Sequence, residues 1–253
     1  MSILFLTAAG AANPDVAAQF GLIPALNEGG PISWSIFIVM VIMSVFSFYI
    51  MFTKLFEQQK VMNQYKEVRA QFWRAATLEE GAAKLDKNSA YRQVVDDGIA
   101  AQKQHVLLTD PIEAHDWLHG AMARSEDSIN NKLASGLPFL ATVGATAPFV
   151  GLLGTVIGIY SALIKIGIAG QADIGKIAGP VGEALIMTAI GLFVAVPAVL
   201  AYNWLQARNK TIARNLATFS NDVLGYISSG GRVKPAVPAA AAPGKPAPAA
   251  VKK

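Results

Sequence analysis

The sequence predicts an all-α membrane protein whose three transmembrane helices continue into long cytoplasmic helical extensions. Three runs of 21, 29 and 29 residues are almost free of charge, and a helix needs about 20 apolar residues to cross a bilayer core. The chain is 53% hydrophobic and only 15% charged, whereas soluble domains average about 25% charged residues. Apolar residues at helical spacing flank the first and third runs, which extends the helices beyond the membrane.

Eight segments follow from these runs and from the composition between them. The last segment has no apolar side chain larger than valine, so it cannot bury a core. In order, we expect an outer N-terminal segment (1–31), a first transmembrane helix (32–52), a cytoplasmic helical domain (53–135), a second transmembrane helix (136–164), a periplasmic hairpin (165–176), a third transmembrane helix (177–205), a cytoplasmic helix (206–230) and a disordered Pro/Ala/Lys tail (231–253).

The basic residues predict the orientation. Residues 1–31 hold no Lys or Arg, residues 54–132 hold eleven, and the segment after Leu205 holds eight. By the positive-inside rule, the sides that carry these nineteen residues are cytoplasmic. The N-terminus is then outside and the C-terminus inside, and anionic lipid headgroups are expected near Lys54 and Arg208.

The segment between the first two spans shows three helical signals. Val61, Tyr65, Val68, Phe72 and Ala76 form an amphipathic stripe. Thr77 to Glu80 has capping-box spacing, which marks a helix start. Asp110 and Pro111 mark another, and no later breaker is evident, so a single helix of about 50 residues is expected to run into the second span.

Several function classes find no support in the composition. The chain lacks cysteine, so it has neither a disulfide framework nor a thiolate metal site. His115 and His119 have a spacing that can ligate zinc. However, no third ligand is evident, and a polar helix face explains them better. We expect no metal, no cofactor, no nucleic-acid partner and no enzymatic activity, because no nucleophile–base pair or phosphate loop is present.

The second span carries a stripe of small residues on one helical face: Gly144, Gly151, Gly154, Gly158 and Ala162. Small residues let transmembrane helices approach closely, where lipid gives little hydrophobic drive for association. Thr155 borders this face, and Pro148 should bend the helix because it cannot donate its backbone hydrogen bond. The span is therefore expected to pack closely against another helix.

The third span repeats this device with Ala184, Thr188, Gly191, Ala195 and Ala198. Glu183 is its one ionisable residue, and it lies about 100° around the helix from Ala184. Carboxylates inside a span are costly and usually mark an interior or a water path. Glu183, Thr155 and Thr188 are thus expected near a shared interior. The alternatives are that Glu183 reaches out to the interface and that each threonine bonds only to its own helix.

Two long motifs carry a resemblance to a known family. GATAPFVGLLGTVIGIYSAL in the second span and GEALIMTAIGLFVAVPAVLAYN in the third are similar to segments of the MotA/TolQ/ExbB proton-channel family. The likeness covers residues 110–225. The four spans of flagellar MotA fit this chain poorly. The long outer N-terminal segment and FYIMFTKLFEQQK after the first span favour the ExbB branch over the TolQ branch.

The resemblance implies a homopentameric ring in the bacterial inner membrane around the transmembrane helices of a single-span, ExbD-type partner. It further implies that proton flow drives a TonB-type protein that energises outer-membrane transport. Family pore residues map onto Glu183, Thr155 and Thr188, of which the sequence pattern alone selects only Glu183.

Two rival functions stay open at this point. One is a TolQ-type subunit of the Tol-Pal envelope system, and the other is a passive membrane scaffold in which Glu183 serves only as an assembly contact. A scaffold does not need a group that titrates. The sequence does not distinguish H⁺ from Na⁺ as the conducted ion.

Overall fold

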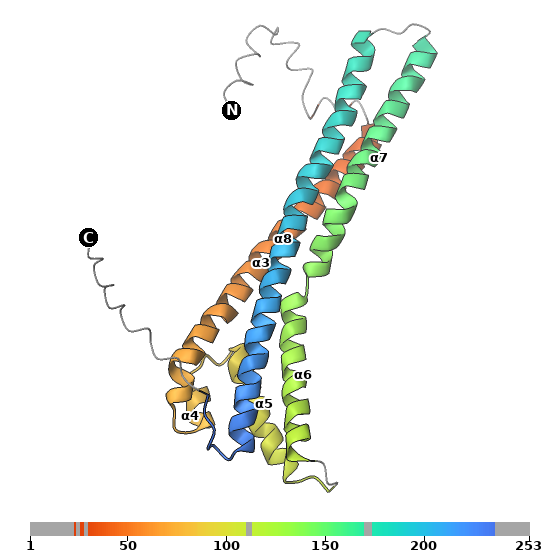
Figure 1. The fold of residues 1–253 in the computed structure, drawn as a ribbon. Helices are drawn as coiled ribbons and strands as arrows, with labels where there is room; N and C mark the ends of the chain where they lie inside the picture. The colour runs from red at the N-terminus through yellow and green to blue at the C-terminus, as the bar shows by residue number, and fades with distance from the viewer. Residues whose placement is uncertain (1–22, 24–25, 28–29, 110–112, 170–173, 236–253) are drawn as a thin grey trace, which may run out of the picture. The chain divides into compact units, whose positions relative to one another are not determined.

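The computed structural model describes residues 23, 26–27, 30–109, 113–169 and 174–235, and the regular elements in these residues are all helical. Figure 1 shows long helices joined to a few short ones. The elements are α3 (Gly30–Gln71), the 3₁₀ helix η1 (Phe72–Arg74), α4 (Leu78–Ala83), α5 (Ala90–His105), α6 (Ala114–Ala134), α7 (Leu137–Ala169) and α8 (Ile174–Ser228).

The chain divides into two compact units, which are described separately below. The membrane unit comprises residues 1–53 and 136–206, and the extramembrane unit comprises residues 54–135 and 207–253. Helices α3 and α8 each contribute residues to both units.

Three helical stretches in the described residues are long and apolar enough to cross a membrane: Gly30–Arg74, Ala114–Ile168 and Ala184–Ser228. Large apolar side chains on them face outward, among them Tyr49, Tyr160 and Phe193, which are 67%, 65% and 72% exposed. Such exposure of aromatic residues is costly in water and is normal toward lipid. The predicted all-α fold with three spans is therefore confirmed.

The core of the membrane unit lies between α3, α7 and α8 (Figure 1). Helix α3 contributes Ile36 and Met40, α7 contributes Val143 and Ala147, and α8 contributes Met187 together with small residues further along the helix. Three buried members of this core, Ala147, Ala195 and Ala198, are alanines, which let helix backbones approach closely, as lipid-embedded helix pairs require.

The core of the extramembrane unit is larger and more aromatic. Phe72 packs edge-on against Phe219, with ring centroids 5.2 Å apart, and Tyr91 packs edge-on against the same ring at 5.4 Å. Burial raises the pKa of the Tyr91 phenol. Around this cluster α3, α5, α6 and α8 bury apolar stripes, as amphipathic helices do.

The predicted stripe holds for Val61 and Val68 on α3 and for Phe72 at the start of η1, all of which are buried. It fails at Ala76, which is exposed, because α3 ends at Gln71 and the chain passes through η1. Ala75 is buried in its place.

The capping signal at Thr77 is confirmed with one difference. The Thr77 hydroxyl accepts a hydrogen bond from the Glu80 amide at 3.2 Å, as the motif requires. The Glu80 carboxylate, however, accepts from the amide of Ala76, one residue earlier than in the standard box. Its hydrogen bond with Lys84 is the main cause that lowers the pKa of Glu80.

The expectation of one unbroken helix into the second span is wrong. The chain turns at Ser135 and Gly136, which separate α6 from α7. Gly136 has φ +83, a left-handed conformation that side chains with a Cβ disfavour. The start signal at Asp110 and Pro111 lies outside the described residues, and α6 begins at Ala114.

Helix α8 ends at Ser228, and Gly230 and Gly231 follow with positive φ. The amide of Gly231 donates to the carbonyl of Tyr226 at 2.8 Å, which closes the helix end. Residues 236–253 of the expected tail, most of the N-terminal segment, and residues 170–173 of the hairpin lie outside the described residues.

We predict that Gly136→Ala destabilises the protein by about 1–2 kcal/mol, the cost of a left-handed backbone with a Cβ. The added Cβ would also lie 3.2 Å from Cγ2 of Ile50. Thermal unfolding in detergent measures the effect. The matched control is Gly120→Ala within α6, where the Cβ would have only Arg124 nearby, and which should stabilise the helix. Equal stability of the Gly136→Ala variant and the wild type would contradict this account of the break.

Candidate functional site

Helices α7 and α8 touch along a line of glycines, hereafter the α7–α8 seam. A Cβ placed on Gly151 would lie 2.7 Å from the carbonyl oxygen of Met187 and 3.1 Å from Cα of Gly191. A Cβ on Gly191 would lie 2.8 Å from the carbonyl oxygen of Ala147. Real Cβ atoms do not approach backbone this closely, so only glycine allows the two backbones to touch here.

The seam continues on both sides of this contact. A Cβ on Gly144 would collide with Val199, and a Cβ on Gly154 would lie 3.0 Å from Cβ of Met187. Gly158, one turn beyond Gly154, is also buried. All five glycines selected from the sequence thus lie at buried positions, and four of them have α7–α8 neighbours within contact distance.

The two threonines lie on this seam but differ in how deeply they are buried. Thr155 is 8% exposed, and its hydroxyl donates to the carbonyl of Leu152 in its own helix at 2.7 Å. The alternative of a bond to its own helix is therefore realised for Thr155, although its oxygen can still accept a hydrogen bond, for example from a water. Thr188 is partly buried, and its Cα would lie 3.3 Å from a Cβ on Gly151.

Glu183 belongs to α8, in the turn that leads into this contact. Its side chain lies outside the part of the chain that the structure describes. The next residue on the helix, Ala184, is 1% exposed, whereas Leu185 is 68% exposed. Since successive residues are 100° apart on a helix, the position of Glu183 borders the buried face and not its centre.

A buried hydroxyl in the membrane unit was not singled out from the sequence. Ser47 of α3 is 6% exposed, and its Oγ has no hydrogen-bond partner among the described residues. It lines a small cavity with Leu140 of α7 and Pro197 of α8. The sequence signal was weak because α3 carries several serines with no ionisable neighbour.

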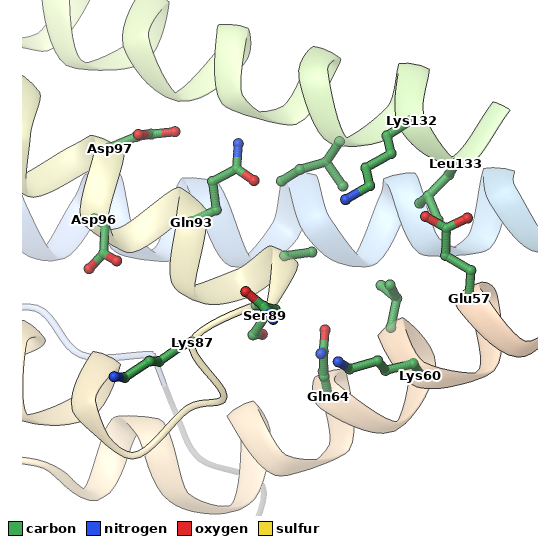
Figure 2. A pocket seen from close by; sticks show the side chains of 14 residues that line it. Glu57, Lys60, Gln64, Lys87, Ser89, Gln93, Asp96, Asp97, Lys132 and Leu133 are labelled. Carbon is green, nitrogen blue, oxygen red and sulfur yellow. The ribbon is translucent and has the colours of Figure 1, made fainter. Parts of the chain in front are cut away.

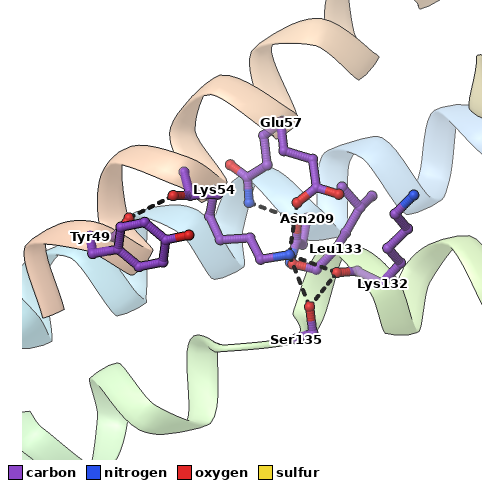
Figure 3. Close-up of polar contacts among 9 residues, drawn as sticks. Tyr49, Lys54, Glu57, Lys132, Leu133, Ser135 and Asn209 are labelled. Atoms are coloured by element: carbon purple, nitrogen blue, oxygen red, sulfur yellow. Dashed lines mark hydrogen bonds and ion pairs between the residues drawn. The ribbon is translucent and has the colours of Figure 1, made fainter. Parts of the chain in front are cut away.

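The second polar centre is the Lys54 cluster, made of Lys54, Glu57 and the end of α6 (Figure 3). The Lys54 ammonium donates to the Glu57 carboxylate at 2.7 Å, to the Lys132 carbonyl at 2.8 Å and to the Ser135 hydroxyl at 2.9 Å. The last carbonyls of a helix lack partners within the helix and attract cations. Lys54 therefore caps the C-terminus of α6.

Helix α8 also contributes hydrogen bonds that hold the end of α6. The Asn209 amide donates to the Leu133 carbonyl at 3.1 Å, and the Gln58 amide donates to Asn209 at 2.7 Å. Two consecutive carbonyls of α6 thus receive side-chain donors from α3 and α8. This cluster holds the end of α6 in place directly before the turn at Gly136.

The expected headgroup contact of Lys54 does not fit this geometry. The Lys54 side chain is 10% exposed and its ammonium has three protein acceptors. Arg208 donates to Gln59 at 2.8 Å. The charge pattern identified both basic residues but not their partners, because the carbonyl that Lys54 meets belongs to a residue 78 positions away in the sequence.

The histidine pair lies on α6 with its rings stacked, 6.3 Å between centroids. In the residues that the structure describes, no group of three potential metal-ligating side chains is found.

Comparisons with known proteins bear on this arrangement. A sequence model of the MotA/TolQ/ExbB proton channel family matches residues 86–218. The chain is 37% identical over 244 residues to a biopolymer transport protein ExbB of Xanthomonas campestris pv. campestris (strain B100), covering 90% of this chain and 96% of that protein. An ExbB of Neisseria meningitidis serogroup A is 35% identical over 212 residues, covering 78% and 92%.

A Tol-Pal system protein TolQ of Pseudomonas aeruginosa is 34% identical over 170 residues, covering 65% of this chain and 72% of that protein. The chain therefore belongs to the MotA/TolQ/ExbB proton channel family. It is a multi-pass membrane protein of a family of channels, which is not a known class of enzymes.

We predict that Gly151→Ala separates the seam and lowers the stability by about 1–3 kcal/mol, the usual cost of overpacking. The new methyl group would face backbone atoms, which cannot rotate away. Thermal unfolding in detergent and native mass spectrometry measure stability and assembly. The matched control is Gly182→Ala on α8, where a Cβ has no neighbour within 4 Å. If both variants are as stable as the wild type, the seam is looser than described.

We predict that Lys54→Met destabilises the extramembrane unit by about 1.5–3 kcal/mol, because hydrogen bonds to a charged group are lost and the Glu57 carboxylate loses its partner. Chemical unfolding followed by the fluorescence of Trp73 and Trp117, both packed on the core of this unit, measures the effect. Lys66→Met, at an exposed position on α3, is the control. Equal effects of the two changes would show that the Lys54 cluster does not fasten α6.

Proposed function

We propose that the chain is the channel-forming motor subunit of an inner-membrane complex that uses the proton motive force to energise TonB-dependent outer-membrane transport. The observation that carries the proposal is the α7–α8 seam, because Glu183, the one charged residue of the apolar stretch 177–205, precedes Thr188 on the α8 side of that contact. An ionisable residue in a span is a functional candidate by default.

The chemistry assigned to Glu183 is reversible proton binding. The transmembrane potential supplies about 2.3 kcal/mol per charge for each 100 mV. A proton that enters from outside neutralises the carboxylate, and release to the inside restores its charge. A central partner helix that prefers one state of Glu183 over the other would then shift as each proton passes, which converts proton flow into movement.

The seam gives this chemistry a fixed frame. Because Gly151 and Gly191 bring the backbones into contact, the backbone of Thr188 beside Gly151 is held in place by that contact. The proposed proton route runs through Glu183 and the two threonine hydroxyls. The helix-packing role belongs to Gly144, Gly151, Gly154, Gly158 and Gly191.

The basic residues support the orientation. We place the extramembrane unit in the cytoplasm, because nineteen of the 21 basic residues lie in it or in the segment after Leu205. The N-terminus and the hairpin at 165–176 are then periplasmic.

The partners follow the family. We infer a homopentameric ring that surrounds an ExbD-type single-span protein and acts on a TonB-type protein. The ExbB relatives support this branch over the TolQ branch, because they match 90% and 78% of the chain against 65% for the TolQ of Pseudomonas aeruginosa. A Tol-Pal role is the second candidate.

We predict that Glu183→Gln assembles with the partner protein but abolishes energy-dependent uptake through TonB-dependent transporters. Glutamine keeps the shape and the hydrogen bonding of glutamate but cannot release a proton. The measurement is uptake of a labelled TonB-dependent substrate in an ExbB-deficient Gram-negative host, with copurification of the single-span partner as the test of assembly.

The matched control is Glu67→Gln, the same change at an exposed position of α3, which should leave uptake unchanged. Uptake at the wild-type rate by the Glu183→Gln variant would refute the proton-carrier role. A wild-type chain that restores envelope integrity in a TolQ-deficient host, but not uptake, would favour the Tol-Pal system instead.

A further inference from the structure

A cavity of about 740 Å³ in the extramembrane unit lies between α3, α5 and α6 (Figure 2). Its walls are predominantly polar. Lys60 and Gln64 come from α3, Ser89 and Gln93 from the start of α5, and Lys132 from the end of α6. The proton-channel function proposed above makes no use of this cavity.

The N-terminus of α5 opens into this space. The first amides of a helix have no acceptors within the helix and carry partial positive charge. Ser89 is the N-cap residue, but its side chain makes no capping hydrogen bond, and the first turn contains no acidic residue. The first amides of α5 therefore lack the side-chain acceptor that usually caps the start of a helix.

Two buried polar atoms at the cavity lack partners. Ser89 is 3% exposed and Gln64 is 5% exposed, yet neither Ser89 Oγ nor Gln64 Oε1 has a hydrogen-bond partner among the described residues. Buried polar groups are normally satisfied by protein or by water, so these two atoms call for a partner that the described residues do not supply. A half-turn of the Gln64 amide would offer its NH₂ group to an acceptor.

The lysines that line the cavity are only partly neutralised by ion pairs. Lys60 pairs with Asp86 at 3.1 Å. No ion-pair partner is found for Lys87 or Lys132 in the part of the chain that the structure describes, and both line the cavity. Figure 2 shows Lys132 reaching from α6 toward the space above Lys60 and Ser89.

The acidic residues of the lining do not compete for this position. The Glu57 carboxylate is paired with Lys54 at 2.7 Å, and Asp96 is paired with Arg92 at 3.4 Å. Asp96 and Asp97 lie about two turns beyond Ser89, roughly 10 Å along α5. They face the far end of the cavity, where a ligand's hydroxyl or amino group could donate to them.

We propose that this cavity binds a phosphate ester, with the phosphate at the N-terminus of α5. The amides of the first turn, the Ser89 hydroxyl and the ammonium group of Lys132 hold its oxygens, whereas Figure 2 shows Lys87 pointing away from this position. A helix N-terminus joined by lysines is a common way to bind phosphate. The polar alcohol of the ester extends toward Asp96 and Asp97.

Two sources share this chemistry: a soluble phosphate compound and the headgroup of an anionic phospholipid. Lys60 lies seven residues after Thr53 on α3, about 10 Å along the helix, so a lipid headgroup is within reach of the cavity. The test therefore uses one probe for each source, inorganic phosphate and phosphatidylglycerol.

The experiment uses the full chain in detergent. Calorimetric titration measures the binding of inorganic phosphate, and native mass spectrometry measures the retention of phosphatidylglycerol against phosphatidylcholine with the same acyl chains. We expect Lys132→Gln and Ser89→Ala each to weaken binding of the active probe about tenfold, which corresponds to about 1.4 kcal/mol. Ser89→Ala should not alter the unfolding temperature, because the Oγ has no partner to lose.

The matched control is Lys103→Gln, the same charge change at the other end of α5 outside this cavity. It should leave binding unchanged. Saturable binding of phosphate identifies a soluble ligand, and selective retention of phosphatidylglycerol alone identifies a headgroup. The proposal is overturned if neither probe binds, if Lys103→Gln weakens binding as much as Lys132→Gln, or if Ser89→Ala binds as tightly as the wild type.

Discussion

The backbone contact between α7 and α8 is the constraint on which the rest of the membrane unit depends. Gly151 and Gly191 face each other so closely that one methyl group on either would meet backbone atoms at less than 3 Å. In lipid, apolar side chains gain little from leaving the solvent, so van der Waals contact between backbones has to supply the association. The positions of Thr155 and Thr188 follow from this contact, and so does the face next to which Glu183 stands.

The extramembrane unit is built on a different principle. Its aromatic core around Phe219 gains from burial in water, and polar side chains then complete the helix ends. Lys54 and Asn209 supply donors to the last carbonyls of α6, while at the start of α5 the corresponding donors have no side-chain cap. The carbonyls at the end of α6 thus have partners within the protein, whereas the amides at the start of α5 are open to a ligand.

The spans and the small-residue faces could be predicted from the sequence, because hydropathy and helical periodicity depend only on neighbouring residues. Three features could not be predicted in this way. Gly136 reads as another small residue of an apolar run until its φ is known, although Pro138 two residues later is a typical sign of a helix boundary. The partners of Lys54 and the orphaned hydroxyl of Ser89 depend on contacts distant in the chain, which no local pattern encodes.

The claim that α7 and α8 touch along the seam can be tested most directly by disulfide formation, since the chain has no cysteine of its own. The Cβ of residue 154 would lie 3.0 Å from that of Met187, close to the separation of about 3.5–4.5 Å that a disulfide needs. Gly154→Cys combined with Met187→Cys should therefore cross-link within one subunit on mild oxidation in membranes. Gly154→Cys combined with Leu185→Cys, whose side chain points outward, should not. Equal cross-linking of both pairs, or of neither, would contradict the seam.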